Sequence, residues 1–290
     1  MEEKTTLIKE QGYSTEELGY YVATETMEQI RSGRDKVLKS NLDRVICIDG
    51  REGEGGKSTL AFQLAYAYDR SFCLDRVVFS SKDFENALRT AEKGQAIVWD
   101  ESFVGLSSKG SLSKVNKRLV QLLMEVRQRN LFIFIVLPSF FMLEKYVAIF
   151  RSQALFHCYC SKESVNRRYY KIYNYNNKKL LYIFGKALMS YYKPKVPYSY
   201  RFYAKFPPTI DRVEYEQKKK TAFLDISEDN TSPYTKHVKQ RDIAWWLLTK
   251  VHGVKQKELQ QIYKQYGMSI DPSTICVAMR TVTEKMKNED

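Results

Sequence analysis

Two hydrophobic patterns alternate between residues 41 and 160 of this 290-residue chain. Short, uninterrupted apolar runs, of which RVICID at 44–49 is the first, predict buried strands. Between them, apolar residues recur every three or four positions, which predicts helices. This alternation predicts an α/β fold with a mostly parallel sheet that helices cover on both faces. The other strand segments are 76–81, 95–101, 131–139 and 154–160, and the helical segments are 57–69, 82–94, 111–130 and 140–152.

The pattern changes after residue 160. Two β-prone arms flank Asn176-Asn177, and such a dipeptide between such arms predicts a β-hairpin. A proline-rich connector and a polar helix at 211–224 come next. The chain ends in three helical segments, in which Asp271 is the expected N-cap of the last one and Pro272 its first residue. These three segments lie at 240–251, 255–266 and 272–288.

The N-terminal segment fits a helix at 14–39, with Ser14 and Glu17 as a capping box. Together with the changes of pattern, this divides the chain into five expected parts. They are a helical extension at 1–40, the α/β core at 41–160, a basic, tyrosine-rich hairpin and connector at 161–224, a linker at 225–239 and a helical domain at 240–290.

A glycine-rich segment, GREGEGGKST, joins the first strand of the core to the next helix. Strand–loop–helix units of this kind bind phosphates, because backbone N–H groups and the helix N-terminus point at the anion. The spacing here is Gly-x5-Gly-Lys-Ser, one residue longer than Gly-x4, and we place the insertion at Glu54 or Gly55. The alternative is a glycine-rich turn that binds nothing. The residues expected to bind ATP are Gly50, Gly53, Gly55, Gly56, Lys57, Ser58 and Thr59.

Two acids, Asp100 and Glu101, end the strand segment 95–101. At the carboxyl end of a buried strand, such a pair is typical of the second nucleotide motif of P-loop ATPases. We expect Ser58 to ligate Mg²⁺, Asp100 to hold it through water, Lys57 to reach the β- and γ-phosphates, and Glu101 to polarise the attacking water. The alternative is an acidic strand end that binds no ligand. A small-molecule kinase would not need Glu101 as a base, so the pair favours hydrolysis of ATP.

Three arginines are candidates for a finger that stabilises charge on the γ-phosphate of a neighbouring subunit in a ring ATPase, and each fits equally well a solvated charge at a helix end. Ser139, at the end of the strand segment 131–139, lies where a polar sensor is expected. The candidate arginines are Arg127, Arg129 and Arg151.

The formal net charge of +13 is concentrated in one block. Residues 151–220 contain 16 Lys and Arg against four Asp and Glu, together with 12 of the 21 tyrosines. This composition favours a nucleic-acid surface, in which cations contact phosphates and aromatic rings stack on bases. The alternative is a hairpin with cross-strand tyrosine pairs and protective edge lysines. The expected DNA contacts here are Arg167, Arg168, Lys171, Lys178 and Lys179.

The last helices have the plan of a helix-turn-helix, with Gly267 in the turn and a longer helix after it. The alternative is a helical packing or oligomerisation module. The residues expected to contact DNA are Lys255, Lys257, Ser273, Thr274 and Arg280.

The motifs GREGEGGKST, QAIVWDES and NLFIFIVLPSFFMLEKY resemble those of RecA-like P-loop ATPases of the additional-strand group. Within it, residues 40–160 resemble the FtsK/HerA-type and zonular-occludens-toxin-like ATPases of phages, plasmids and archaeal viruses. The resemblance implies ATP and Mg²⁺ as cofactors, action on DNA, and a homo-oligomer, often a hexameric ring. The chain departs from it in the Gly-x5 spacing and in having no membrane span after the core, so no membrane partner is expected.

The N-terminus has no secretory or transit signal, and five cysteines fit a reduced compartment, so we expect a cytoplasmic protein. The sequence thus predicts an ATPase motor for translocation, packaging or replication of a virus or mobile element. One alternative is an ATP-switched DNA-binding regulator or partition-type protein, and a less favoured one is a small-molecule kinase.

Overall fold

The computed structural model describes residues 7–9, 12–13, 18–50, 56–100, 109–161, 167–229 and 233–288. The chain divides into two compact units, Met1–Leu224 and Asp225–Asp290.

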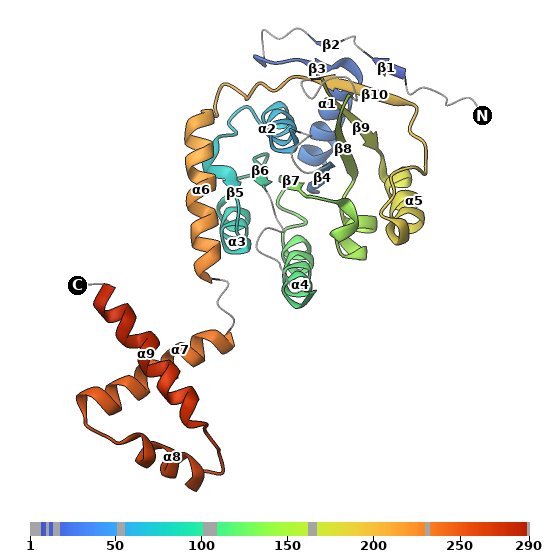
Figure 1. Cartoon of the computed structure of the whole chain (residues 1–290). Helices are drawn as coiled ribbons and strands as arrows, with labels where there is room; N and C mark the ends of the chain where they lie inside the picture. Colours follow the sequence, from blue (N-terminus) through green and yellow to red (C-terminus); the bar gives the residue numbers. More distant parts are fainter. Residues whose placement is uncertain are drawn as a thin grey trace. The chain divides into compact units, whose positions relative to one another are not determined.

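The first unit is built on an eight-stranded sheet with the order β1-β10-β9-β8-β4-β7-β6-β5 (Figure 1). The five strands from β8 to β5 are all parallel, as the alternating pattern predicts. β7 lies between β4 and β6, so the strand that precedes the glycine-rich loop is not the neighbour of the strand that precedes Asp100. The five strands are β4 (Arg44–Gly50), β5 (Val77–Val78), β6 (Ala96–Trp99), β7 (Phe132–Val136) and β8 (Ala154–Cys160).

Three further strands extend this sheet beyond β8. β9 (Arg168–Tyr173) is antiparallel to β8, β10 (Tyr198–Phe202) is antiparallel to β9, and β1 (Leu7–Lys9) is parallel to β10. The sheet therefore continues without a break past residue 160, where the sequence pattern predicts the end of the core.

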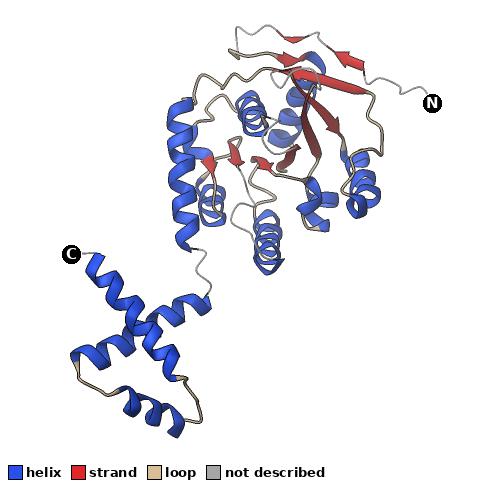
Figure 2. Ribbon diagram, viewed as in Figure 1, coloured by secondary structure: helices blue, strands red, loops and turns tan. Residues whose placement is uncertain are grey.

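Helices cover both faces of the sheet, which Figure 2 shows in blue around the red strands. Successive residues of β4 alternate between the faces: Ile46 and Ile48 pack with α1 and α2, whereas Val45 and Cys47 pack with α3, α4 and α5. α6 packs on the side of α1 and α2 through Tyr215. The helices are α1 (Thr24–Lys39), α2 (Lys57–Tyr68), α3 (Ser81–Thr90), α4 (Lys109–Glu125), α5 (Tyr175–Gly185) and α6 (Arg212–Asp229).

The N-terminal helix is shorter than predicted. It begins at Thr24, after a small antiparallel pair of strands, β2 (Gly12–Tyr13) and β3 (Val22–Ala23). Ser14 and Glu17, the expected capping box, lie outside the described residues.

The predicted hairpin around Asn176-Asn177 is wrong, because the second arm is the helix α5. The side-chain oxygen of Asn174 accepts a hydrogen bond from the N–H of Asn177 at 2.9 Å and caps this helix. Residues 178, 181, 182 and 185 form its buried face at helical spacing. Because the first of these positions is Lys178, a charged residue, the sequence did not show an apolar helical period here.

The segment predicted as a linker, 225–239, is mostly helical. α6 continues to Asp229, and α7 begins at Pro233. Besides the last residues of α6, the second unit contains α7 (Pro233–Trp246) with a π-helical last turn at Leu247–Val251, α8 (Gln256–Gln265) and α9 (Pro272–Asn288). A small core of its own holds these helices together, and its buried residues are Trp245, Leu259, Ile275, Ala278 and Met279.

None of the helices in the described part of the chain contains an apolar stretch long enough to cross a membrane.

Candidate functional site

The two described ends of the glycine-rich loop are β4 and α2. Gly56 is the N-cap of α2 and has a left-handed φ of 61°, which favours glycine. At Gly50 a Cβ would lie 2.5 Å from the carbonyl oxygen of Cys158, so β4 and β8 approach too closely there for a side chain. Gly53 and Gly55 lie outside the described residues.

Lys57 and Ser58 open helix α2 directly after this loop. The ammonium group of Lys57 donates to the carbonyl oxygen of Gly50 at 3.1 Å, so it lies over the start of the loop. The hydroxyl of Ser58 donates to Oδ1 of Asp100 at 2.9 Å. The structure thus brings together three residues to which the sequence assigned phosphate and magnesium binding. Thr59, the next residue of α2, is buried.

Asp100 follows β6 and is fully buried. Its backbone N–H donates to the carbonyl oxygen of Val78 at 2.9 Å, which fixes the main chain beyond the strand. The hydroxyl of Tyr215 on α6 donates to Oδ2 of Asp100 at 2.6 Å. Each carboxylate oxygen therefore has a hydroxyl donor from a different helix. Glu101, the expected catalytic acid, lies outside the described residues.

These groups lie at one edge of the sheet because β4 and β6 both run parallel to β7. Parallel strands have their carboxyl ends at the same edge, so Gly50 at the end of β4 and Asp100 after β6 both lie there. The N-terminus of α2 adds partial positive charge at this edge.

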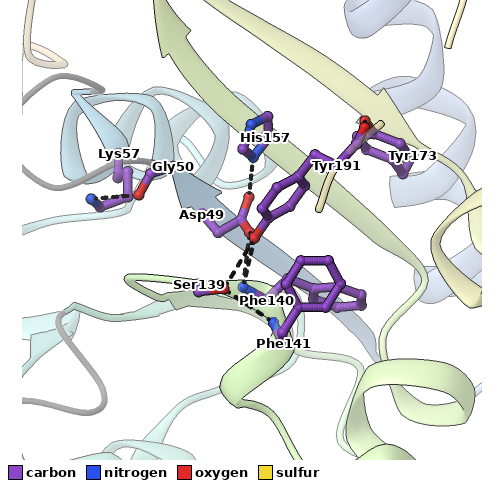
Figure 3. Close-up of polar contacts among 9 residues, drawn as sticks. All are labelled: Asp49, Gly50, Lys57, Ser139, Phe140, Phe141, His157, Tyr173 and Tyr191. Atoms are coloured by element: carbon purple, nitrogen blue, oxygen red, sulfur yellow. Dashed lines mark hydrogen bonds and ion pairs between the residues drawn. The ribbon is translucent and has the colours of Figure 1, made fainter. Parts of the chain in front are cut away.

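A second buried polar group, centred on Asp49, lies at the same edge (Figure 3). Asp49 directly precedes the loop and is fully buried. Its Oδ2 accepts from the backbone N–H of Phe140 at 2.8 Å and from the hydroxyl of Tyr191. Its Oδ1 accepts from Nδ1 of His157 at 2.8 Å. The rings of His157 and Tyr191 stack with centroids 4.0 Å apart.

This Asp49 group joins the end of β4 to the segments that follow β7 and to β8. Burial and the neighbouring Asp49 carboxylate raise the pKa of Tyr191, which keeps its hydroxyl protonated as a donor. The hydroxyl of Ser139, predicted as a sensor, lies 3.2 Å from that of Tyr191. Through Tyr191, Ser139 is connected to Asp49 at the end of β4.

Arg168, one of the predicted DNA contacts, packs against Gly56 at the start of α2. Its Cδ is 3.2 Å and its Nε 3.5 Å from the position that a Cβ of Gly56 would occupy. Nε is buried and has no hydrogen-bond partner within the described part of the chain. The side chain therefore brings a positive charge to the N-terminus of α2.

The three finger candidates lie away from this edge. Arg127 and Arg129 precede β7, and Arg151 precedes β8. Because these strands run parallel to β4, residues that precede them lie at the opposite edge of the sheet. Arg151 is buried and pairs with Asp43, so its predicted role as a finger is wrong: a finger must reach a nucleotide. Arg129 donates to the carbonyl oxygens of Leu88 and Arg89, both at 2.7 Å, and so caps the end of α3. Arg127 is exposed.

The five cations predicted to contact DNA after residue 160 do not share one environment. Arg167 and Lys179 are exposed, whereas Lys171 is half-buried, with its ammonium group 5.4 Å from the ring centre of Tyr159. Lys178 is fully buried and donates to the carbonyl oxygens of Ala148 at 2.7 Å and Ile149 at 2.8 Å. The predicted DNA contact of Lys178 is wrong, because its charge satisfies backbone oxygens inside the protein.

The buried Lys178 gives a testable dependence of stability on pH. Burial lowers its pKa to about 8, whereas an exposed lysine titrates near 10.5. Between these values the unfolded chain binds a proton that the folded chain has released, so stability rises with pH. We expect the unfolding free energy of the wild type, relative to Lys178→Met, to increase by roughly 3 kcal/mol across this interval.

Urea denaturation at several pH values measures this difference. The matched control is Lys179→Met, since the neighbouring lysine is exposed. Its difference from the wild type should not change with pH. A constant offset between the wild type and Lys178→Met across the interval would contradict the prediction.

In the second unit, all five predicted DNA contacts are exposed. The helix α9 begins at Pro272, as predicted, and the backbone N–H of Ser273 donates to Oδ1 of Asp271 at 2.8 Å. The Ser273 hydroxyl also donates to this oxygen. The exposed set is Lys255, Lys257, Ser273, Thr274 and Arg280.

Comparisons with known proteins include a structural neighbour. No protein-family model matches the sequence, and no curated protein matches it. Among solved structures, the chain is similar to the N-terminal domain of zonular occludens toxin from Neisseria meningitidis, at 15% identity and a TM-score of 0.29. The similarity covers 46% of this chain and 84% of that chain. A TM-score this low supports neither a shared mechanism nor a shared partner.

Proposed function

We propose that this protein is a Mg²⁺-dependent P-loop ATPase with a RecA-like core that acts on DNA. The observation that carries the proposal is the hydrogen bond from Ser58 to Asp100, beside Lys57 at the start of α2. In P-loop ATPases a serine or threonine of the loop and a strand-end aspartate together hold the magnesium ion. The position of β7 between β4 and β6 agrees with the additional-strand group.

The residues present fit a magnesium nucleotide. Hydroxyl and carboxylate oxygens are ligands that Mg²⁺ prefers, and Ser58 and Asp100 offer one of each. Bound magnesium would neutralise charge on the phosphates. Lys57 and the N-terminus of α2 would bind the phosphate oxygens, and the Asp49 group would keep the loop in place. Glu101 remains the expected base for the attacking water.

Action on DNA rests on exposed charge. Lys255, Lys257 and Arg280 lie on the surface of a helical unit whose plan is that of a helix-turn-helix. Arg167 and Lys179 are exposed on the first unit. We propose phosphate contacts at these positions, and a homo-oligomer as the working form of the ATPase.

An ATPase assay with and without DNA tests this function. We expect Mg²⁺-dependent hydrolysis that rises when DNA is added. A slow rate that DNA does not change, together with sequence-specific binding, would favour the ATP-switched regulator over a motor. No hydrolysis in either condition would reject the ATPase itself.

Arg168→Ala should weaken nucleotide binding. A hydrogen bond from a charged group contributes about 1.5–3 kcal/mol, so we expect the affinity for a fluorescent ADP analogue to fall by roughly 10-fold or more. Arg167→Ala is the matched control, because Arg167 is the adjacent, exposed arginine. If both variants lose DNA binding equally and keep their nucleotide affinity, Arg168 contacts DNA and does not contact the phosphates of the bound nucleotide.

A further inference from the structure

The buried carboxylate of Asp100 is held by a helix far away in the sequence. Tyr215 lies in the first turn of α6, 115 residues after Asp100, and its hydroxyl donates to Oδ2 at 2.6 Å. Ser58 donates to the other oxygen, Oδ1. Two donors on opposite oxygens hold the carboxylate in one orientation.

Tyr215 itself is held by aromatic packing. Its ring meets that of Phe62 at 5.0 Å and 77°, and that of Phe206 at 5.6 Å and 73°. Phe62 belongs to α2, the helix that begins with Lys57. Edge-to-face contacts of this kind are worth about 0.5–1.5 kcal/mol each. The phenol therefore has a fixed position relative to both the loop helix and Asp100.

The next turn of α6 is also anchored. The ammonium group of Lys218 donates to the carbonyl oxygen of Leu74 at 2.8 Å, just before β5. Burial lowers the pKa of Lys218, which agrees with a side chain that lies along the protein surface rather than in solvent. Two contacts in successive turns keep the start of α6 against the rest of the first unit.

We infer that Tyr215 is a positioning residue of the magnesium site, and that α6 is thus a part of the ATPase machinery. Its hydroxyl holds Oδ2 of Asp100 and so orients the carboxylate, which together with the Ser58 hydroxyl would hold the ion. Groups that orient a metal ligand in this way typically change metal affinity 10–100-fold when removed. The inference rests on the proposed function, because it assigns a role at the same site.

The test is Tyr215→Phe, which keeps the ring and its packing and removes only the hydroxyl. Binding of a fluorescent ADP analogue is titrated with Mg²⁺, and separately measured in EDTA. We expect the Mg²⁺ concentration for half-maximal binding to rise about 10-fold, while affinity in EDTA stays unchanged. The kcat for ATP should recover when Mg²⁺ is raised by the same factor.

Tyr20→Phe is the matched control. Tyr20 is also buried on this side of the sheet, and its hydroxyl donates to the carbonyl oxygen of Gln63, away from Asp100. Both variants lose one buried hydrogen bond, which costs about 1 kcal/mol of stability. Only Tyr215→Phe should change the Mg²⁺ dependence. Thermal melting of both variants checks that they fold.

Two results would overturn the inference in different ways. If the wild type binds the analogue and both variants keep its Mg²⁺ dependence, Tyr215 is merely structural and the ATPase proposal stands. If the wild type itself shows no Mg²⁺-dependent binding, the proposed function fails and the inference fails with it.

Discussion

Lys57→Ala should slow hydrolysis of ATP by orders of magnitude and strongly weaken nucleotide binding. The lysine opens α2, and its ammonium group lies 3.1 Å from the carbonyl oxygen of Gly50 across the loop. Alanine removes the positive charge of Lys57 at the helix start, where phosphate oxygens would bind. Loss of a preorganised donor at developing charge costs about 10²–10³ in rate. The measurement is steady-state ATPase activity together with binding of a fluorescent ADP analogue.

The fold should survive the Lys57→Ala change, because what is lost is one hydrogen bond, worth about 1 kcal/mol. Lys39→Ala is a suitable control, since this lysine ends α1 and is exposed. It should retain full activity. Hydrolysis by Lys57→Ala at the wild-type rate would mean that the loop does not bind the nucleotide.

Asp100→Asn should strongly reduce ATP hydrolysis. It should also make nucleotide binding independent of Mg²⁺. The amide has one oxygen and one NH₂ group in place of two carboxylate oxygens. Because Ser58 and Tyr215 both donate to this residue, one donor would face the NH₂ group. We expect hydrolysis to fall by roughly 10²–10³, while binding of nucleotide in EDTA persists. We also expect about 1–3 kcal/mol of lost stability.

Titration of nucleotide binding with Mg²⁺ measures the effect of Asp100→Asn directly. The wild type should bind more tightly as Mg²⁺ increases, and the variant should not respond. Asp75→Asn is the control, because Asp75 is an exposed aspartate before β5. A variant that keeps the Mg²⁺ response of the wild type would place the ion elsewhere.

The hydrophobic pattern predicted the central sheet well, because each buried parallel strand is an apolar run and each covering helix has its own period. It failed at α5, where a buried lysine at 178 interrupts the apolar face. The pattern also could not predict whether an individual lysine is exposed or buried. Pattern alone treats every lysine as exposed, and Lys178 satisfies carbonyl oxygens in the interior.

The residues around the site show the same limit. Lys57, Ser58 and Asp100 could be named from the sequence because they belong to short motifs with a fixed spacing. No local spacing predicted that Tyr215, His157 or Arg168 would lie at this site. Each reaches the site from a distant element, through strand pairing or helix packing.

By itself, the sequence determined an α/β core with a glycine-rich loop, a lysine and serine at a helix start, and an aspartate at a strand end. Only the tertiary structure decided that Ser58 donates a hydrogen bond to Asp100 and that Tyr215 donates to its other carboxylate oxygen. It also decided that Asp49, at the end of β4, accepts a hydrogen bond from the backbone of Phe140. The reason is physical: periodicity reports which side of an element is buried, whereas contacts between distant segments depend on the order of the strands and the packing of the helices upon them.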